Sequence, residues 1–193
     1  MVLGLTGAIG CGKSTAGRLF EQFGLSRIDC DDIARELLTS DVGVIAEVVD
    51  AFGDRVMDRD GNLDRREIAS IVFTDRSQLT VLEKIVHPRV SERWKGAVAA
   101  DPDSHWVVEI PLLFEKNLQK WFDFTICLSC DRETQLERLN QRGMTPEEAD
   151  QRIAVQFPLA RKVELADHIL LNNGSLPFLS DQINWLIQTR NLT

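Results

Sequence analysis

Short apolar segments alternate with amphipathic segments along much of the chain. Helical spacing follows the first apolar run: in residues 13–23, Ala16, Leu19, Phe20 and Phe23 fall on one face. Strands that alternate with helices predict a parallel sheet with helices on both faces. The expected strands are the apolar runs at 2–6, 26–29, 106–110, 122–128 and 167–171.

Residues from about 41 to 100 break this alternation, because they hold helical patterns and no convincing strand. Residues 131–165 are also helical in pattern and are rich in arginine. The sequence therefore predicts one α/β domain with a five-stranded parallel sheet. Its core would comprise 1–40, 101–130 and 166–193, with a helical insertion at about 41–100 and a lid at about 131–165.

The composition is that of an ordinary globular protein, with 44% hydrophobic and 27% charged residues. No apolar run approaches the roughly 20 residues that span a bilayer, and the N-terminus has no signal-peptide pattern. We therefore expect a cytoplasmic protein that does not enter a membrane. The formal net charge of -8 argues against a nucleic-acid-binding protein, which needs a basic face.

The four cysteines are few enough to consider one by one. Cys127 and Cys130 form a single C-x-x-C, which is typical either of a redox or metal pair or of a strand that ends in small residues. Without a second such pair or a nearby histidine, the sequence favours the strand end.

The segment from Gly7 to Ser14 reads G-A-I-G-C-G-K-S and matches the phosphate-loop pattern G-x-x-x-x-G-K-[ST]. Its glycines let backbone N–H groups approach phosphate oxygens, and the following helix adds its positive end. Lys13 can reach the β- and γ-phosphates, and the Ser14 hydroxyl can bind Mg²⁺. The predicted ATP-binding residues of this segment are Gly7, Gly10, Cys11, Gly12, Lys13, Ser14 and Thr15.

Three carboxylates, Asp29, Asp31 and Asp32, follow the second predicted strand. Ligands of an open parallel sheet bind at the carboxyl ends of its strands, where the phosphate loop also lies. A carboxylate there can orient Mg²⁺ or accept a proton from an attacking hydroxyl. An acidic first turn of a helix explains the same residues, and spacing alone leaves both interpretations open.

Further motifs occur in a fixed order along the chain. Asp29-Cys30-Asp31 with Ala34-Arg35 is followed by Asp60–Arg65 (DGNLDR), His87-Pro88, Pro111–Glu115 (PLLFE) and Asn172-Asn173-Gly174. Together with the phosphate loop at the start of the chain, this series resembles the dephospho-coenzyme A kinases over nearly the whole length. Cys30 stands where that family often has alanine.

The resemblance implies a kinase that uses MgATP to phosphorylate the ribose 3′-hydroxyl of dephospho-coenzyme A. Asp31 would be the base or orienting carboxylate for that hydroxyl, and Lys13 would act on the transferred phosphate. Arg35 and His87 would lie near the acceptor, and Asp29 and Glu115 are expected in its pocket. Cys11 and Cys30 would place two thiols near the site, which leaves oxidation sensitivity open.

The arginines of residues 131–165 suit a lid that closes over phosphates and stabilises their charge. For most of them, pairing with glutamates on a solvated helix is the better explanation. Arg138 and Arg142, one turn apart, are the predicted nucleotide contacts, and Arg142 is also a predicted catalytic residue. The resemblance places Asn172-Asn173-Gly174 near the adenine, and Asn173 and Gly174 are the predicted ATP-binding residues of this motif.

Several other patterns point elsewhere. Residues 56–67 nearly fit a calcium loop, but Val56 stands where a carboxylate is required. The D-x-x-G at Asp58–Gly61 is typical of a regulatory GTP switch, although no guanine motif N-K-x-D occurs. Another small-molecule or nucleotide kinase is the nearer alternative. Glu109, at the end of a strand, could act on Mg²⁺ through water. We also expect the protein to be a monomer.

Overall fold

The computed structural model describes residues 1–192, apart from the side chain of Phe73. Contacts divide it into two units: Met1–Asp29 with the chain from Asp101 onward, and Cys30–Ala100. The second unit contains α2 (Cys30–Ser40), because this helix packs against other helices of that unit. The sequence-based division, with an insertion from about 41, remains a prediction about domains.

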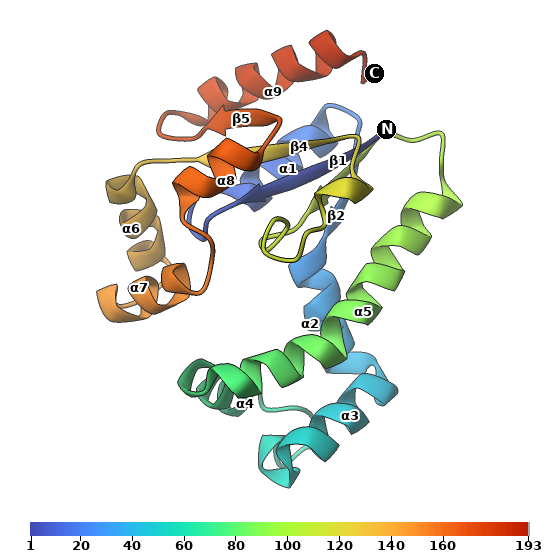
Figure 1. The fold of residues 1–193 in the computed structure, drawn as a ribbon, viewed down its shortest axis with the longest axis vertical. Coiled ribbons are helices and arrows are strands. Elements are labelled where there is room, and N and C mark those ends of the chain that lie inside the picture. Colours follow the sequence, from blue (N-terminus) through green and yellow to red (C-terminus); the bar gives the residue numbers. More distant parts are fainter. Residues whose placement is uncertain (193) are drawn as a thin grey trace. The chain divides into compact units, whose positions relative to one another are not determined.

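The first unit is built on a parallel sheet (Figure 1). The strands are β1 (Val2–Gly7), β2 (Ser26–Asp29), β3 (Trp106–Glu109), β4 (Phe124–Ser129) and β5 (His168–Leu171). They lie in the order β2-β3-β1-β4-β5, and every pairing is parallel. The predicted α/β class with a five-stranded parallel sheet is confirmed.

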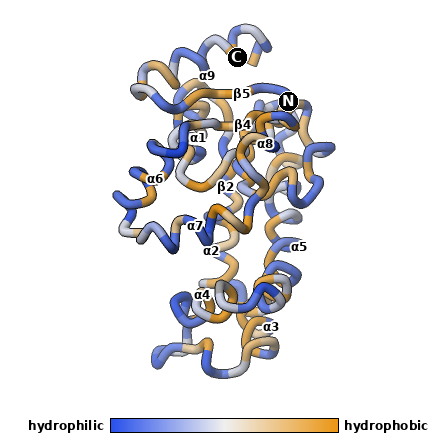
Figure 2. Tube along the Cα trace, turned by 60° about the vertical axis from the view of Figure 1, so that its left-hand side comes forward, coloured by the Kyte–Doolittle hydropathy of each residue, from blue (hydrophilic) through white to orange (hydrophobic). Residues whose placement is uncertain are grey.

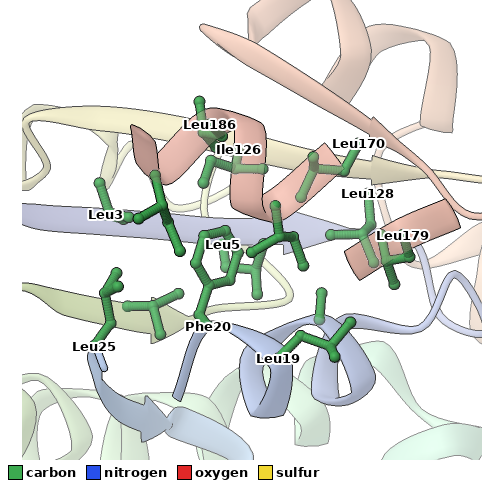
Figure 3. Packing of buried hydrophobic residues seen from close by; sticks show 14 of the residues in the cluster. Leu3, Leu5, Leu19, Phe20, Leu25, Ile126, Leu128, Leu170, Leu179 and Leu186 are labelled. Carbon is green, nitrogen blue, oxygen red and sulfur yellow. The ribbon is translucent and has the colours of Figure 1, made fainter. Parts of the chain in front are cut away.

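The helices described in this unit are α1 (Lys13–Gln22), α6 (Arg132–Gln141), α7 (Pro146–Ala154), α8 (Leu159–Leu165) and α9 (Leu176–Arg190). A short helical turn, η2 (Gln119–Trp121), precedes β4. Alternate residues of a strand point to opposite faces of the sheet. On one face Leu3, Leu5 and Ile126 pack with Phe20 of α1 and Leu186 of α9 (Figure 3).

The opposite face is covered by the segment that follows β3 and by α8. A Cβ atom on Gly4 would lie 2.7 Å from Leu113 and 2.8 Å from Phe122, so this segment presses directly on β1. The hydroxyl of Thr6 donates to the Pro111 carbonyl at 3.2 Å. Figure 2 shows β4 and β5 as mostly hydrophobic and α6 as mostly hydrophilic. β4 is buried along most of its length, whereas Ile169 and Leu171 of β5 are exposed.

The second unit consists of α2, α3 (Val42–Phe52), η1 (Asp54–Val56), α4 (Arg65–Thr74) and α5 (Arg76–Ala100). Asp41 and Asp64 cap α3 and α4 by accepting backbone N–H groups. The cap at Asp64 shows that a helix begins within the segment 56–67, whose sequence nearly fits a calcium loop. Among residues 1–192, no helix combines the length and the apolar character needed to cross a membrane.

Candidate active site

The loop between β1 and α1 adopts a conformation that requires glycine. Gly10 and Gly12 have φ of 83° and 93°, in the region that side-chain-bearing residues rarely adopt. A Cβ atom on Gly12 would lie 2.2 Å from the side-chain nitrogen Nδ2 of Asn172. The loop therefore combines an unusual backbone path with a close approach by a residue that follows β5.

Three amide side chains hold the backbone of this loop. Gln135 Nε2 of α6 donates to the Ile9 carbonyl at 2.6 Å, and Ile9 N donates to Gln156 Oε1 at 3.0 Å. Asn172 Nδ2 donates to the Cys11 carbonyl at 2.9 Å. The loop is thus fixed by neighbours from three different segments. Of these, the sequence indicated only Asn172, as part of the N-N-G motif, and it did not predict this contact.

Lys13 begins α1, and its Nζ donates to the carbonyls of Gly7 at 3.1 Å and Ala8 at 3.4 Å. Its ammonium group therefore lies against the loop. Ser14 and Thr15 follow in the first turn of the helix with exposed side chains. A glycine-rich loop that leads into a helix N-terminus, a lysine and hydroxyls together make a site suited to a polyphosphate.

Arg138 of α6 lies next to the loop, as expected of a nucleotide contact. Its Nη2 donates to the Asn172 carbonyl at 2.9 Å. Its Nη1 lies 3.8 Å from the position of a Cβ on Gly12, and is buried with no hydrogen-bond partner within residues 1–192. A buried guanidinium nitrogen normally finds an acceptor, so this atom is available to an anionic ligand at the loop.

The other predicted nucleotide residues lie nearby but are less enclosed. Asn173 accepts a hydrogen bond from the Asp131 N–H at 3.0 Å, and its neighbour Gly174 is exposed. Arg142 follows the last turn of α6 and is exposed. The N-N-G motif was the signal for Asn172 as well, but it gave no reason to prefer Asn172 over Asn173 as the residue that reaches the loop.

The ends of β2 and β3 carry an ion-paired cluster. Arg27 Nε donates to Glu109 Oε1 at 2.5 Å, and its Nη2 to Asp29 Oδ2 at 3.1 Å. Burial raises the pKa of Glu109, while the hydrogen bond from Arg27 opposes that shift. Burial alone would lower the pKa of Arg27. The hydrogen bond to Glu109 and the negative charge of Glu109 outweigh this effect, so that the Arg27 pKa is raised.

Glu115, in the segment after β3, is held by a buried lysine. Lys162 of α8 is fully buried, and its Nζ lies 2.9 Å from Glu115 Oε1 and donates to the Pro111 carbonyl at 2.6 Å. Glu115 Oε1 also accepts the Phe157 N–H at 2.8 Å. The pair therefore connects the segment after β3 to the C-terminal end of the lid region, residues 131–165.

The remaining predicted site residues belong to the second unit. Asp31 is exposed in the first turn of α2, and is separated from the end of β2 by a single residue. Arg35 forms a 2.5 Å ion pair with Asp32, with both side chains more than half exposed. His87 is partly buried in α5, just before the Pro88 that this helix accommodates.

A parallel sheet in this strand order, with a complete phosphate loop between its central strand and α1, defines a P-loop nucleoside-triphosphate-binding protein. The sequence model of one family, dephospho-CoA kinase, matches residues 1–177. The chain therefore belongs to the dephospho-CoA kinase family, is an enzyme, and has the kinase activity that the family name states.

Individual relatives agree with this assignment. The dephospho-CoA kinase of Carboxydothermus hydrogenoformans is 38% identical over 97% of this chain and 93% of its own. That of Synechococcus sp. CC9902 is 41% identical over 96% and 94%. Among solved structures, the dephospho-CoA kinase of Campylobacter jejuni superposes with a TM-score of 0.71 at 25% identity, covering 98% of this chain and 96% of that one.

Two further structures extend the comparison. TT1252 of Thermus thermophilus gives a TM-score of 0.85 at 30% identity, over 100% of this chain and 98% of that one. A shikimate kinase of Acinetobacter baumannii gives 0.55 at 18% identity, over 100% and 95%. The second likeness concerns the fold alone.

Proposed function

We propose that the enzyme transfers the γ-phosphate of ATP to the ribose 3′-hydroxyl of dephospho-coenzyme A, giving coenzyme A and ADP. The observation that carries the nucleotide half of this proposal is the loop from Gly7 to Ser14, bordered by Lys13 and by the unpartnered Nη1 of Arg138. The acceptor half rests on membership of the family.

The triphosphate lies along the loop and is held by its backbone N–H groups, from Gly10 to Thr15. Lys13 exchanges its contacts with loop carbonyls for the β- and γ-phosphates, which attract its charge more strongly. Arg138 and Arg142 stabilise charge on the transferred phosphoryl group. Asn173 and Gly174, after β5, lie beside the nucleoside.

The residues present fit Mg²⁺ as the metal that accompanies ATP. Mg²⁺ prefers oxygen ligands, keeps several waters and is bound largely through substrate phosphates. The exposed hydroxyl of Ser14 is such a ligand, and no group of three or more metal-binding side chains occurs among the described residues. When bound, Mg²⁺ neutralises charge on the β- and γ-phosphates. Glu109 is committed to Arg27, so we assign Ser14 alone to the metal.

Asp31 orients the acceptor hydroxyl and takes its proton as the hydroxyl attacks in line. Its exposed carboxylate, in the first turn of the helix that follows β2, supports this role. Asp29, Arg35, His87 and Glu115 bind the acceptor. To bind an acceptor phosphate, Arg35 must leave its present partner Asp32. This costs little free energy, because an exposed ion pair is weak.

The reaction is tested by incubating the protein with MgATP and dephospho-coenzyme A. We expect one added phosphate by mass spectrometry, removable by a phosphatase specific for 3′-phosphates, and one ADP formed per product. Parallel reactions with GTP measure how strictly ATP is preferred. A product phosphorylated elsewhere, or turnover only with another acceptor, would refute the proposal.

Asp31 is tested by comparing Asp31→Asn with Asp32→Asn, which removes the same charge from the next residue of the exposed helix turn. We expect Asp31→Asn to lower kcat by on the order of 100-fold, and Asp32→Asn to keep kcat within a few-fold. If the two substitutions had equal effects, Asp31 would not be the proton acceptor, and its role would be that of an acidic residue in the first turn of the helix.

We further propose that the enzyme acts as a monomer in the cytoplasm, without nucleic acid. Its formal net charge of -8 supports the last point. Light scattering coupled to size-exclusion chromatography measures the oligomeric state; a dimer at working concentration would contradict the proposal.

A further inference from the structure

Two cysteines meet beside the phosphate loop. The Cys130 thiol donates a hydrogen bond to Cys11, with the two Sγ atoms 3.3 Å apart. Cys11 lies in the loop after β1, and Cys130 follows β4. Because β1 and β4 are neighbouring parallel strands, with Gly7 opposite Leu128, their carboxyl ends bring the two thiols together. Both side chains are buried.

This pairing differs from the groupings that the sequence suggested. Cys127, the other member of the C-x-x-C, lies within β4, and its Sγ contacts the Leu128 carbonyl at 3.6 Å. Burial raises the pKa of Cys127 to about 12, so it stays a thiol. Cys30 begins the helix of the other unit. Within residues 1–192, the thiol that touches Cys11 is Cys130.

The surroundings of Cys11 favour its reactive form. The hydrogen bond from Cys130 lowers the pKa of Cys11, burial opposes this, and the charge of Lys13 adds to the lowering. The same hydrogen bond raises the pKa of Cys130, which keeps its proton. A thiolate is the species that attacks oxidants and disulfides. The pair therefore consists of a potential nucleophile and an adjacent proton donor.

We propose that Cys11 and Cys130 form a reversible oxidation site at which a peroxide converts the two thiols into a disulfide. The Cys11 thiolate attacks one peroxide oxygen and the O–O bond breaks. The leaving hydroxide takes up the proton that the Cys11 thiol gave up, so that a sulfenic acid and one water result. The Cys130 sulfur then attacks the Cys11 sulfur; the S–S bond forms as the hydroxyl leaves and takes the Cys130 proton as a second water. Two thiols lose two electrons, and hydrogen peroxide gains them.

The disulfide would alter the loop. Bonded sulfurs lie about 2 Å apart, so the two Sγ atoms must approach each other from their 3.3 Å separation. The Cys11 carbonyl is meanwhile held by Asn172, so the approach distorts the loop backbone between Gly10 and Gly12. Displacement of a binding group by about 1 Å can cost on the order of 100-fold in rate. This consequence rests on the proposed role of the loop in binding ATP.

The experiment treats the reduced, full-length protein with hydrogen peroxide. We expect the loss of two hydrogens by intact mass, two alkylatable thiols left after denaturation out of the four cysteines, and a cross-linked peptide that contains Cys11 and Cys130. Kinase activity should fall by on the order of 100-fold and return with dithiothreitol. Circular dichroism before and after treatment checks that the fold is retained.

Two variants sharpen the test. Cys130→Ser should form no such cross-link, and its Cys11 should instead carry added oxygen, as a sulfenic acid or a more oxidised form. Cys127→Ser, at the other cysteine of the C-x-x-C, should behave like the wild type. Four free thiols after treatment, or a cross-link between another pair, would overturn the oxidation site. If the enzyme stayed fully active with a Cys11–Cys130 disulfide, the oxidation site would be confirmed. The proposed effect of the disulfide on the loop would then be wrong, and so would the role proposed for the loop.

Discussion

Gly17 provides a sharp test of how α1 packs on the sheet. It is an interior residue of this helix, where alanine is normally preferred to glycine by about 1 kcal/mol. A Cβ atom at Gly17 would, however, lie 1.9 Å from Glu109 Oε1 and 2.7 Å from Arg27 Nε. Gly17→Ala therefore cannot be accommodated without moving the buried carboxylate of Glu109 away from Arg27.

The size of the effect follows from these two opposing contributions. Breaking a buried ion pair costs about 3–5 kcal/mol, and the 2.5 Å contact between Arg27 and Glu109 is such a pair, with Glu109 only 2% exposed. Subtracting a helix gain of about 1 kcal/mol leaves an expected loss of about 2–4 kcal/mol in the free energy of unfolding. The substitution thus has the opposite sign from the one that helix propensity alone predicts.

Urea denaturation of both Gly17→Ala and Gly96→Ala measures this difference. Gly96 lies inside α5, and apart from its chain neighbours and the backbone of its own helix, no atom of the described residues lies within 4 Å of its Cβ position. Gly96→Ala should therefore stabilise the protein by about 0.5–1 kcal/mol. In a Glu109→Ala background, the loss caused by Gly17→Ala should be smaller, because the carboxylate 1.9 Å from the Cβ position is gone and only the contact with Arg27 Nε at 2.7 Å remains. If Gly17→Ala stabilises the wild type as Gly96→Ala does, the packing of Glu109 against α1 is refuted.

Three further substitutions test other parts of the first unit. Lys162→Met leaves Glu115 buried without its partner, and should cost about 3–5 kcal/mol by urea denaturation, partly restored by adding Glu115→Gln; equal stability would refute the pair's role. Arg138→Ala should lower kcat/KM for ATP by on the order of 100-fold, and an unchanged value would exclude the nucleotide contact. Burial, with a smaller effect of Arg190, holds the pKa of His168 below its ordinary value. The unfolded chain then binds the proton more readily, so stability falls as pH drops through about 6.5; thermal melting of His168→Asn should show a smaller loss, and a parallel loss would contradict this.

The sheet could be predicted because its information is local. β1, β3 and β4 are short apolar runs, and the helix after β1 shows its buried face in the spacing of Ala16, Leu19 and Phe20. The order β2-β3-β1-β4-β5 could not be obtained in the same way. It depends on pairings between residues far apart in the chain, such as Leu3 with Val107 and with Phe124.

The candidate site could likewise be predicted where its residues are contiguous in the sequence, and could not where they come from distant segments. The phosphate loop is a contiguous pattern whose glycines have a conformational reason, so its residues could be proposed as ATP-binding from the sequence alone, and that role stays a prediction. The sequence did not identify Gln135, Gln156 or Lys162 as residues that hold the site. A polar residue in a helical pattern looks the same whether its side chain faces water or a buried partner. Arg27 lies in the weakest strand pattern, and its two carboxylate partners come together only through the β2–β3 pairing.

The residues that hold the loop also connect it to the lid region. Gln135 belongs to α6 and Gln156 follows α7, and both bind the backbone of Ile9. Amides suit this task, because they satisfy the loop's N–H and carbonyl groups without adding charge beside a site for anions. A carboxylate in place of Gln156 would accept the same N–H but repel phosphate. The positive charge next to the loop thus comes from Lys13 and Arg138. A movement of the lid region that displaced Gln135 or Gln156 would remove a hydrogen bond from the backbone of Ile9 and so change the loop.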